Sequence, residues 1–171
     1  MARTPDVGTP APDFTVPGTL RTSAGPERSE YTLSAHRGSP LVLAFYPGDN
    51  TAVCTRQLCS YTSELDRFKD LGATVWGISP QGLDSHEGFA EQYDLRFPLL
   101  ADTEREVARA YGIAVPGLGL RRSVFVLDAE GVVRWKHVAL AGLSFQNVDT
   151  LAERIAEATA VRADGRLHGD Q

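Results

Sequence analysis

The chain has 171 residues, 42% of them hydrophobic and 23% charged, and its formal net charge is −5. This length and composition are typical of one soluble globular domain, which we expect to have a core over about residues 7–160 and a frayed tail over 161–171. The acidic balance argues against nonspecific binding to nucleic acid or to anionic membranes, because both need a basic surface.

No segment of the sequence approaches the roughly 18 apolar residues that a membrane span needs. The first residues, MARTPDVGTPAPDF, lack the apolar stretch of a secretory signal. Two cysteines do not make a disulfide framework, so we expect a reducing, cytoplasmic compartment.

Strands and helices are predicted to alternate along the chain. The Pro-rich start, up to about Phe14, is expected to be extended, and the polar stretch TSAGPERSE (22–30) is expected to be a loop. The continuous apolar run at 41–47 predicts a strand buried on both faces. The segment 52–71 contains no Gly or Pro and predicts one helix, ended by Gly72.

The remainder of the chain continues this alternation and closes with a hairpin and a helix. The elements we expect are strand 73–79, helix 84–93, a short strand in FPLLAD, helix 104–111, hairpin strands 122–128 and 132–140, and helix 148–160. This order predicts the α/β class and a thioredoxin-like fold, with a central mixed β-sheet flanked by helices.

The only two cysteines, Cys54 and Cys59, follow a Pro-Gly turn in YPGDNTAVCTRQLC. On a helix, Cys54 starts an apolar stripe whose other members are Leu58, Tyr61, Leu65 and Phe68. Cys59 lies about 140° around the helix axis and about 7.5 Å along it, so the two Cα atoms are about 8–9 Å apart. A disulfide needs a Cα separation below about 7 Å, and the two sulfurs therefore cannot bond while the helix is intact.

The cysteine pair is compatible with several interpretations. A structural disulfide would close a very short loop and break its own helix, and none of the four histidines lies near enough in sequence to suggest a zinc site. Two unrelated buried cysteines stay an alternative, since free Cys often packs as a small apolar residue. The helix start favours Cys54 as a nucleophile, because the helix dipole and free N–H groups stabilise a thiolate. Thr51 either caps this helix or turns its hydroxyl towards the same pocket.

The segment YPGDNTAVCTRQLCSY resembles the active-site segment of peroxiredoxins, with Pro47, Thr51 and Cys54 matching the Pro-x-x-x-Thr-x-x-Cys motif. The second cysteine, five positions on, resembles the Q-type branch, also known as bacterioferritin comigratory proteins. The likeness covers about residues 7–160, through GTPAPDFTV, VWGISPQGLDSHEGFAEQYDLRFPLLAD and RRSVFVLDAEGVVR. Relatives commonly read Thr-Pro-Gly-Cys where this chain reads Thr-Ala-Val-Cys.

The resemblance implies roles for four residues near the helix start. Cys54 corresponds to the peroxidatic cysteine and Cys59 to the resolving cysteine. Thr51 corresponds to the residue whose hydroxyl orients the peroxide, and Pro47 to the residue that shields the sulfur.

The resemblance also implies a role for one arginine. Arg122, directly before SVFVLD, corresponds to the family arginine, and Gln57 to the polar residue expected near it. Arg121 precedes it, and alternation along a strand places the two side chains on opposite faces.

The activity implied by the resemblance is that of a thiol-dependent peroxidase that reduces hydrogen peroxide and organic hydroperoxides. Cys54 would become a sulfenic acid, Cys59 would resolve it as an intramolecular disulfide, and thioredoxin or a glutaredoxin-like protein would reduce that disulfide. No metal or prosthetic group is implied, and the Q-type resemblance favours a monomer. Two alternatives are a noncatalytic redox sensor or holdase that uses the same disulfide, and a cysteine hydrolase with His137 as its base.

Overall fold

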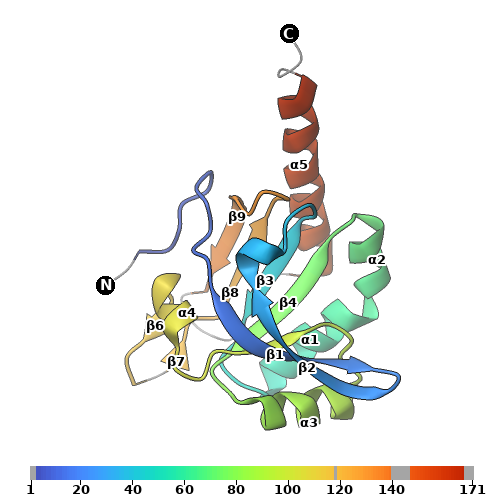
Figure 1. The fold of residues 1–171 in the computed structure, drawn as a ribbon, viewed down its shortest axis with the longest axis vertical. Helices are drawn as coiled ribbons and strands as arrows, with labels where there is room; N and C mark the ends of the chain where they lie inside the picture. Colours follow the sequence, from blue (N-terminus) through green and yellow to red (C-terminus); the bar gives the residue numbers. More distant parts are fainter. Residues whose placement is uncertain (1–2, 118, 140–146, 168–171) are drawn as a thin grey trace.

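A seven-stranded mixed sheet forms the centre of the protein in a computed structural model that describes residues 3–117, 119–139 and 147–167 (Figure 1). The strands lie in the order β2-β1-β5-β4-β3-β8-β9. β3, β4 and β5 are parallel, and the other neighbours pair antiparallel. The bounds are β1 Thr15–Thr22, β2 Gly25–Thr32, β3 Leu41–Phe45, β4 Thr74–Ser79, β5 Leu99–Ala101, β8 Ser123–Leu127 and β9 Val133–Val138.

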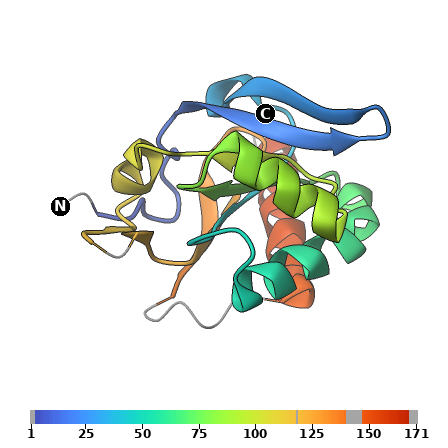
Figure 2. The ribbon, with the colours of Figure 1, turned by 90° about the horizontal axis from the view of Figure 1, so that it is seen from below.

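Helices cover the sheet and divide the core in two. They are α1 Ala52–Ser63, α2 Leu65–Asp70, α3 Leu83–Tyr93, α4 Glu106–Ala110 and α5 Val148–Leu167, with a short 3-10 helix η1 at Leu33–Ala35 and a small second sheet of β6 Ala114–Val115 and β7 Gly119–Leu120. Residues of α1, α2, α3 and α5 pack with Ala44 and Val124 on one face of the sheet. Residues of α4 pack with Leu43 and Phe45 on the other face, and Figure 2 shows α4 well apart from α1 and α5.

This arrangement confirms the predicted α/β class with a central mixed sheet flanked by helices. Adjacent residues of β3 serve the two cores alternately, because successive side chains of a strand point to opposite faces. The continuous apolar run that predicted this strand thus reflects burial on both faces.

The stretch 22–30 was predicted to be a loop, and this is wrong: most of it belongs to β2. That strand lies at the edge of the sheet and most of its side chains are exposed, so no apolar alternation reveals it. The strand is held by its backbone pairing with β1, from Thr15↔Thr32 to Thr22↔Gly25, rather than by burial of its side chains. Figure 2 shows this hairpin alongside α3.

The single helix predicted over 52–71 is also wrong, because the helix ends before Glu64 and restarts as α2. Hydroxyl side chains precede this break. Ser60 donates to the carbonyl of Gln57 at 2.7 Å, and Ser63 donates to the carbonyl of Ser60 at 2.9 Å. Such local bonds compete with regular helix hydrogen bonds and favour a bend or an end.

The last helix is longer than the sequence indicated. α5 continues to Leu167, beyond the predicted end of this helix at residue 160, whereas the frayed tail over 161–171 stays a prediction. Residues 168–171 of that tail, and Leu140 of the predicted hairpin, lie outside the described residues.

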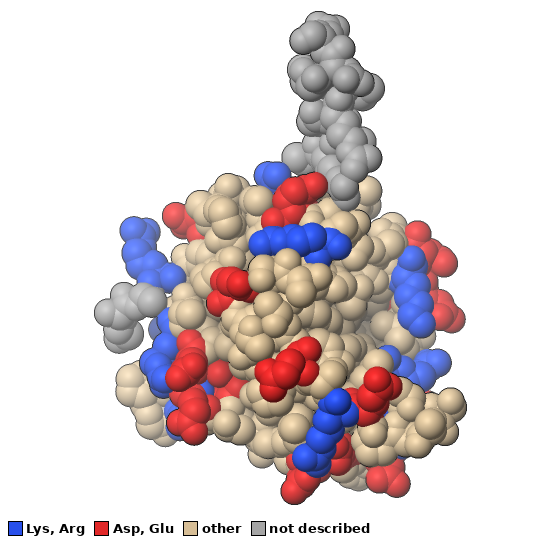
Figure 3. All heavy atoms as spheres, viewed as in Figure 1, with Lys and Arg blue, Asp and Glu red and all other residues tan. Residues whose placement is uncertain are grey.

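The surface seen in Figure 3 carries acidic and basic side chains interspersed, rather than a field of one sign. Among the helices that the structure describes, none has the length and apolar character needed to cross a membrane.

Candidate active site

The loop between β3 and α1 turns sharply and places Cys54 in the first turn of the helix. Asn50 has a φ of 61°, in the left-handed region that Asn tolerates better than most residues. Thr51 then returns to extended backbone, and its carbonyl accepts the N–H of Thr55 at 2.9 Å. Cys54 is 0% exposed, so its side chain lies inside the core. It also lies in the first turn of α1, at the end of the helix where the dipole is positive.

The apolar stripe predicted from the sequence is buried as expected. Cys54, Leu58, Tyr61, Leu65 and Phe68 all belong to the core on this face of the sheet. The break at Glu64 does not disturb the pattern, because both helices turn the same side inwards.

Cys59 lies on the flank of the same helix and is a free thiol, as Cys54 is. Its side chain is partly buried and packs against the margin of the core, although most of its neighbours along the helix are polar. This burial raises the pKa of the Cys59 thiol above its ordinary value, so the thiol is protonated at neutral pH.

Arg122 joins this site from a distant part of the chain, immediately before β8. Its Nη2 donates to the sulfur of Cys54 at 3.0 Å, and its Nη1 donates to Oε1 of Gln57. Arg122 is 3% exposed, whereas the neighbouring Arg121 is exposed. A buried guanidinium in contact with the sulfur is a fixed, charged hydrogen-bond donor to it.

Gln57 continues the contact chain into the core. Its Nε2 donates to the hydroxyl of Tyr61 at 3.0 Å, and both side chains are fully buried. Burial raises the pKa of Tyr61 to about 12, with the bond from Gln57 and the charge of Arg122 acting in the opposite direction, so the phenol stays neutral. Tyr61 was assigned only to the core from the sequence, and the structure shows that it also holds Gln57 in place beneath Arg122.

Arg122 contacts both Cys54 and Gln57, whereas Thr51 and Pro47 lie in the preceding loop. The Thr51 hydroxyl donates to the carbonyl of Gly48 at 3.3 Å and makes no helix-capping bond. Pro47 is half-buried. The catalytic roles assigned to these residues from the resemblance stay predictions.

Sequence reasoning missed a second group of polar side chains directly behind the same loop. Tyr46, Asp49 and His86 are buried and hydrogen-bonded to one another. No spacing signal links Asp49 to His86, which are 37 positions apart.

The described residues give Cys54 no histidine partner. The ring of His137, the base of the hydrolase alternative, is stacked on Trp135, with ring centroids 6.3 Å apart. Within the same residues, no cluster of three or more His, Cys, Asp or Glu side chains has the arrangement of a metal site.

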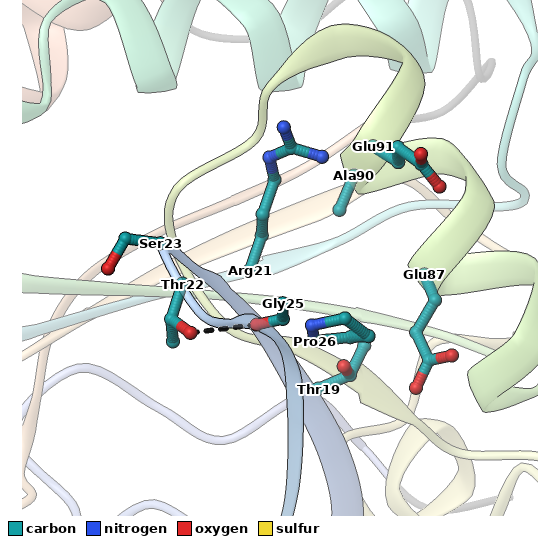
Figure 4. A pocket seen from close by; sticks show the side chains of 9 residues that line it. All are labelled: Thr19, Arg21, Thr22, Ser23, Gly25, Pro26, Glu87, Ala90 and Glu91. Atoms are coloured by element: carbon teal, nitrogen blue, oxygen red, sulfur yellow. Dashed lines mark hydrogen bonds between the residues drawn. The ribbon is translucent and has the colours of Figure 1, made fainter.

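A separate cavity of about 300 Å³ lies between the end of the β1–β2 hairpin and α3 (Figure 4). Glu87 and Glu91 line it from α3 and Arg21 from β1, and at its rim the hydroxyl of Thr22 donates to the carbonyl of Gly25 at 2.7 Å. None of the residues assigned to the Cys54 site lines this cavity.

Comparison with known sequences shows the family to which the chain is related. Residues 7–136 match the AhpC/TSA family. The chain belongs to this family. A putative chloroplastic peroxiredoxin Q of Oryza sativa subsp. indica is 38% identical over 130 residues, which are 75% of this chain and 57% of that protein. A peroxiredoxin of Thermoplasma volcanium is 37% identical over 136 residues, 75% of this chain and 63% of that protein.

These relatives confirm the predicted relationship to the Q-type peroxiredoxins. Another of them, a chloroplastic peroxiredoxin Q of Sedum lineare, is 39% identical over 109 residues, 60% of this chain and 56% of that protein. The chain therefore spans about half the length of the plant relatives that it matches.

Solved structures confirm the thioredoxin-like fold. The reduced 2-Cys peroxiredoxin of Plasmodium vivax superimposes with a TM-score of 0.85 at 20% identity, over 93% of this chain and 84% of that one. AhpC of Mycobacterium tuberculosis gives a TM-score of 0.81 at 23% identity, over 91% of this chain and 99% of that one.

Proposed function

We propose that the protein is a thiol-dependent peroxidase that reduces hydrogen peroxide and organic hydroperoxides, with Cys54 as the nucleophile. One observation carries this proposal: a buried arginine, Arg122, donates to the sulfur of Cys54 at 3.0 Å at the start of a helix. Membership of the AhpC/TSA family supports it.

The first step is an in-line displacement at oxygen. The thiolate of Cys54 attacks one peroxide oxygen, an S–O bond forms and the O–O bond breaks. The leaving oxygen carries away the electron pair of that bond and takes up a proton, which yields water or an alcohol and a Cys54 sulfenic acid. Negative charge moves from sulfur to the leaving oxygen, so a fixed donor such as Arg122 stabilises the transition state as an oxyanion hole does.

The second step uses Cys59. Its thiol condenses with the sulfenic acid, which forms the disulfide and releases water. The two cysteines lie five positions apart on one helix, so α1 must unwind first. The break at Glu64 supports this step, because it allows α1 to open while α2 keeps its own contacts.

The reductant and the cellular setting form the rest of the proposal. An external dithiol protein of the thioredoxin or glutaredoxin type attacks the disulfide and restores both thiols. We propose that this occurs in the cytoplasm, where free thiols persist, and that the protein acts as a monomer. Fractionation of the producing cells tests the first of these points, and sedimentation of the reduced and oxidised protein tests the second.

A coupled assay tests the activity. Protein, hydrogen peroxide, thioredoxin, thioredoxin reductase and NADPH should give continuous NADPH oxidation that depends on all components, and Cys54→Ser should abolish it. A single turnover that no dithiol reductant renews would instead indicate a redox sensor or holdase. Hydrolysis of an activated ester without peroxide consumption would indicate a cysteine hydrolase.

A further inference from the structure

A cluster of four polar side chains lies behind the loop that carries the nucleophile. The carboxylate of Asp49 accepts from the phenol of Tyr46 at 2.7 Å on Oδ1 and from the hydroxyl of Ser85 at 2.7 Å on Oδ2. The same Oδ2 lies 2.7 Å from Nδ1 of His86, whose Nε2 lies 2.9 Å from the carbonyl of Leu100. We term Tyr46, Asp49, Ser85 and His86 the loop cluster.

Three members of the loop cluster, Tyr46, Asp49 and His86, are buried, Ser85 is partly buried, and the cluster joins three separate parts of the fold. The side chains of Asp49 and His86 are both 0% exposed. Asp49 belongs to the loop between β3 and α1, His86 to α3, and Leu100 to β5. The backbone N–H of Asp49 is held as well, by Oε1 of Gln81. The loop that leads to Cys54 is therefore held by α3 and β5, whereas Arg122 precedes β8, the neighbour of β3 on the other side in the sheet.

The hydrogen-bond partners determine how many protons the pair of Asp49 and His86 holds. A carbonyl only accepts, so Nε2 of His86 must carry a hydrogen to bond to Leu100. Nδ1 and Oδ2 then need one further hydrogen between them, because two lone pairs 2.7 Å apart would repel. The phenol of Tyr46 does not supply it: its single hydrogen serves the carboxylate at 2.7 Å rather than Nδ1 at 3.3 Å.

We propose that Asp49 and His86 are positioning residues for the reaction of Cys54: the pair shares one proton, and loss of that proton releases the active-site loop from α3 and β5. The proposal rests on the proposed peroxidase function only for its effect on rate. The release follows from the geometry. A neutral imidazole beside an ionised Asp49 has one hydrogen for two acceptors, so either the Asp49 bond or the Leu100 bond must break.

Other groups near the imidazole do not take over its role. Tyr46 is the other titratable side chain in contact with it, and burial, followed by the nearby charge of Asp49, raises the pKa of Tyr46 well above its ordinary value. The phenol thus stays a donor as the pH rises. The acidic residues next to His86 on α3, Asp84 and Glu87, both pair with Arg28 of β2 at the surface.

The direct test is an NMR titration of the reduced wild-type protein from about pH 6 to about pH 10, which spans the ordinary range of His and Cys ionisation. At the acidic end the ¹⁵N signals of His86 should show hydrogen on Nε2 and a second hydrogen on Nδ1 or shared with Asp49. As that proton is lost, exchange of the Asp49 amide, whose N–H is bonded to Gln81, should accelerate at least tenfold more than that of the β3 amides. The proposal would be overturned if Nδ1 of His86 carried no hydrogen at either the lowest or the highest pH. It would also be overturned if amide exchange in the loop did not change together with the imidazole signal.

The variant Asp49→Asn can keep the hydrogen bonds of the cluster without the shared proton. The amide of the variant can accept from Tyr46 and donate to a neutral His86, so the loop should stay in place and its exchange should no longer depend on the His86 titration. Asp84→Asn is the matched control, because Asp84 is 97% exposed on the same helix and should leave the wild-type behaviour unchanged. Since the wild-type titration decides by itself, the proposal stays testable even where the buried variant fails to fold.

Kinetics provide the last measurement. Once the loop is released, the rate of Cys54 oxidation per thiolate should fall about 10-fold to 100-fold, as misplacement of a reacting group does. Asp49→Asn should lose this alkaline decline and keep the rise due to thiol ionisation. An unchanged rate after a confirmed release of the loop would remove the positioning role, whereas absence of peroxidase activity would leave the titration result intact and refute only the proposed function.

Discussion

Replacement of Arg122 by Ala probes the contact on which the proposed mechanism depends. At 3.0 Å and an effective dielectric of about 20, a guanidinium attracts a thiolate by about 5–6 kcal/mol. Only part of this attraction affects the barrier, because Arg122 stabilises the charge before the reaction as well as during it. We therefore expect Cys54 oxidation to slow by about 10²–10³-fold, the loss typical of one oxyanion-hole donor, or about 2.7–4 kcal/mol.

The assay is stopped-flow oxidation of the reduced protein by hydrogen peroxide, followed by trapping of the sulfenic acid. Arg121→Ala is the matched control, because that side chain is exposed one position away. Arg122→Lys should give an intermediate rate, since Lys keeps the charge and loses the fork that also holds Gln57. Equal effects of the Arg121 and Arg122 substitutions, or a loss below about tenfold for Arg122→Ala in a folded protein, would refute the reasoning.

The remaining predictions concern the two thiols and α1. Cys54→Ser should abolish sulfenic-acid trapping, whereas Cys59→Ser should consume about one equivalent of peroxide and accumulate the trapped species; loss of the first oxidation in Cys59→Ser would reverse the two roles. Formation of the disulfide should remove hydrogen-exchange protection from Ala52–Ser63 and leave β3 unchanged, and preserved protection in a sample shown by mass to carry the Cys54–Cys59 bond would exclude unwinding. That opening exposes Leu58, now 0% exposed, at a cost of about 1.5–3 kcal/mol, so it should be rare before oxidation. Because burial raises the pKa of Cys59, its alkylation in the reduced protein should lag that of a free cysteine peptide several-fold near pH 8 and approach it as the pH rises; equal rates near pH 8 would show that Cys59 is open to solvent.

The sequence by itself determined those features that depend on neighbours along the chain. The stripe of Cys54, Leu58 and Tyr61 follows from helical spacing, and its burial could be predicted because an apolar stripe must face a core. The turn before Cys54 could be located from Pro47 and Gly48, and the buried strand β3 from its unbroken apolar run. The likeness to peroxiredoxins added the identity of the arginine, since spacing alone does not choose between Arg121 and Arg122.

Only the tertiary structure decided which distant polar groups meet. Arg122 lies 68 positions after Cys54 and Asp49 lies 37 positions before His86, and both meetings depend on which strands lie side by side in the sheet. The edge strand β2 escaped prediction for a related reason, because its order comes from pairing with β1 rather than from its own side chains. The spacing of apolar residues along a segment indicates which residues face a core. It does not indicate which buried side chains from two distant segments form a hydrogen bond. The contacts that surround the nucleophile are of this second kind, and so they became visible only in the folded chain.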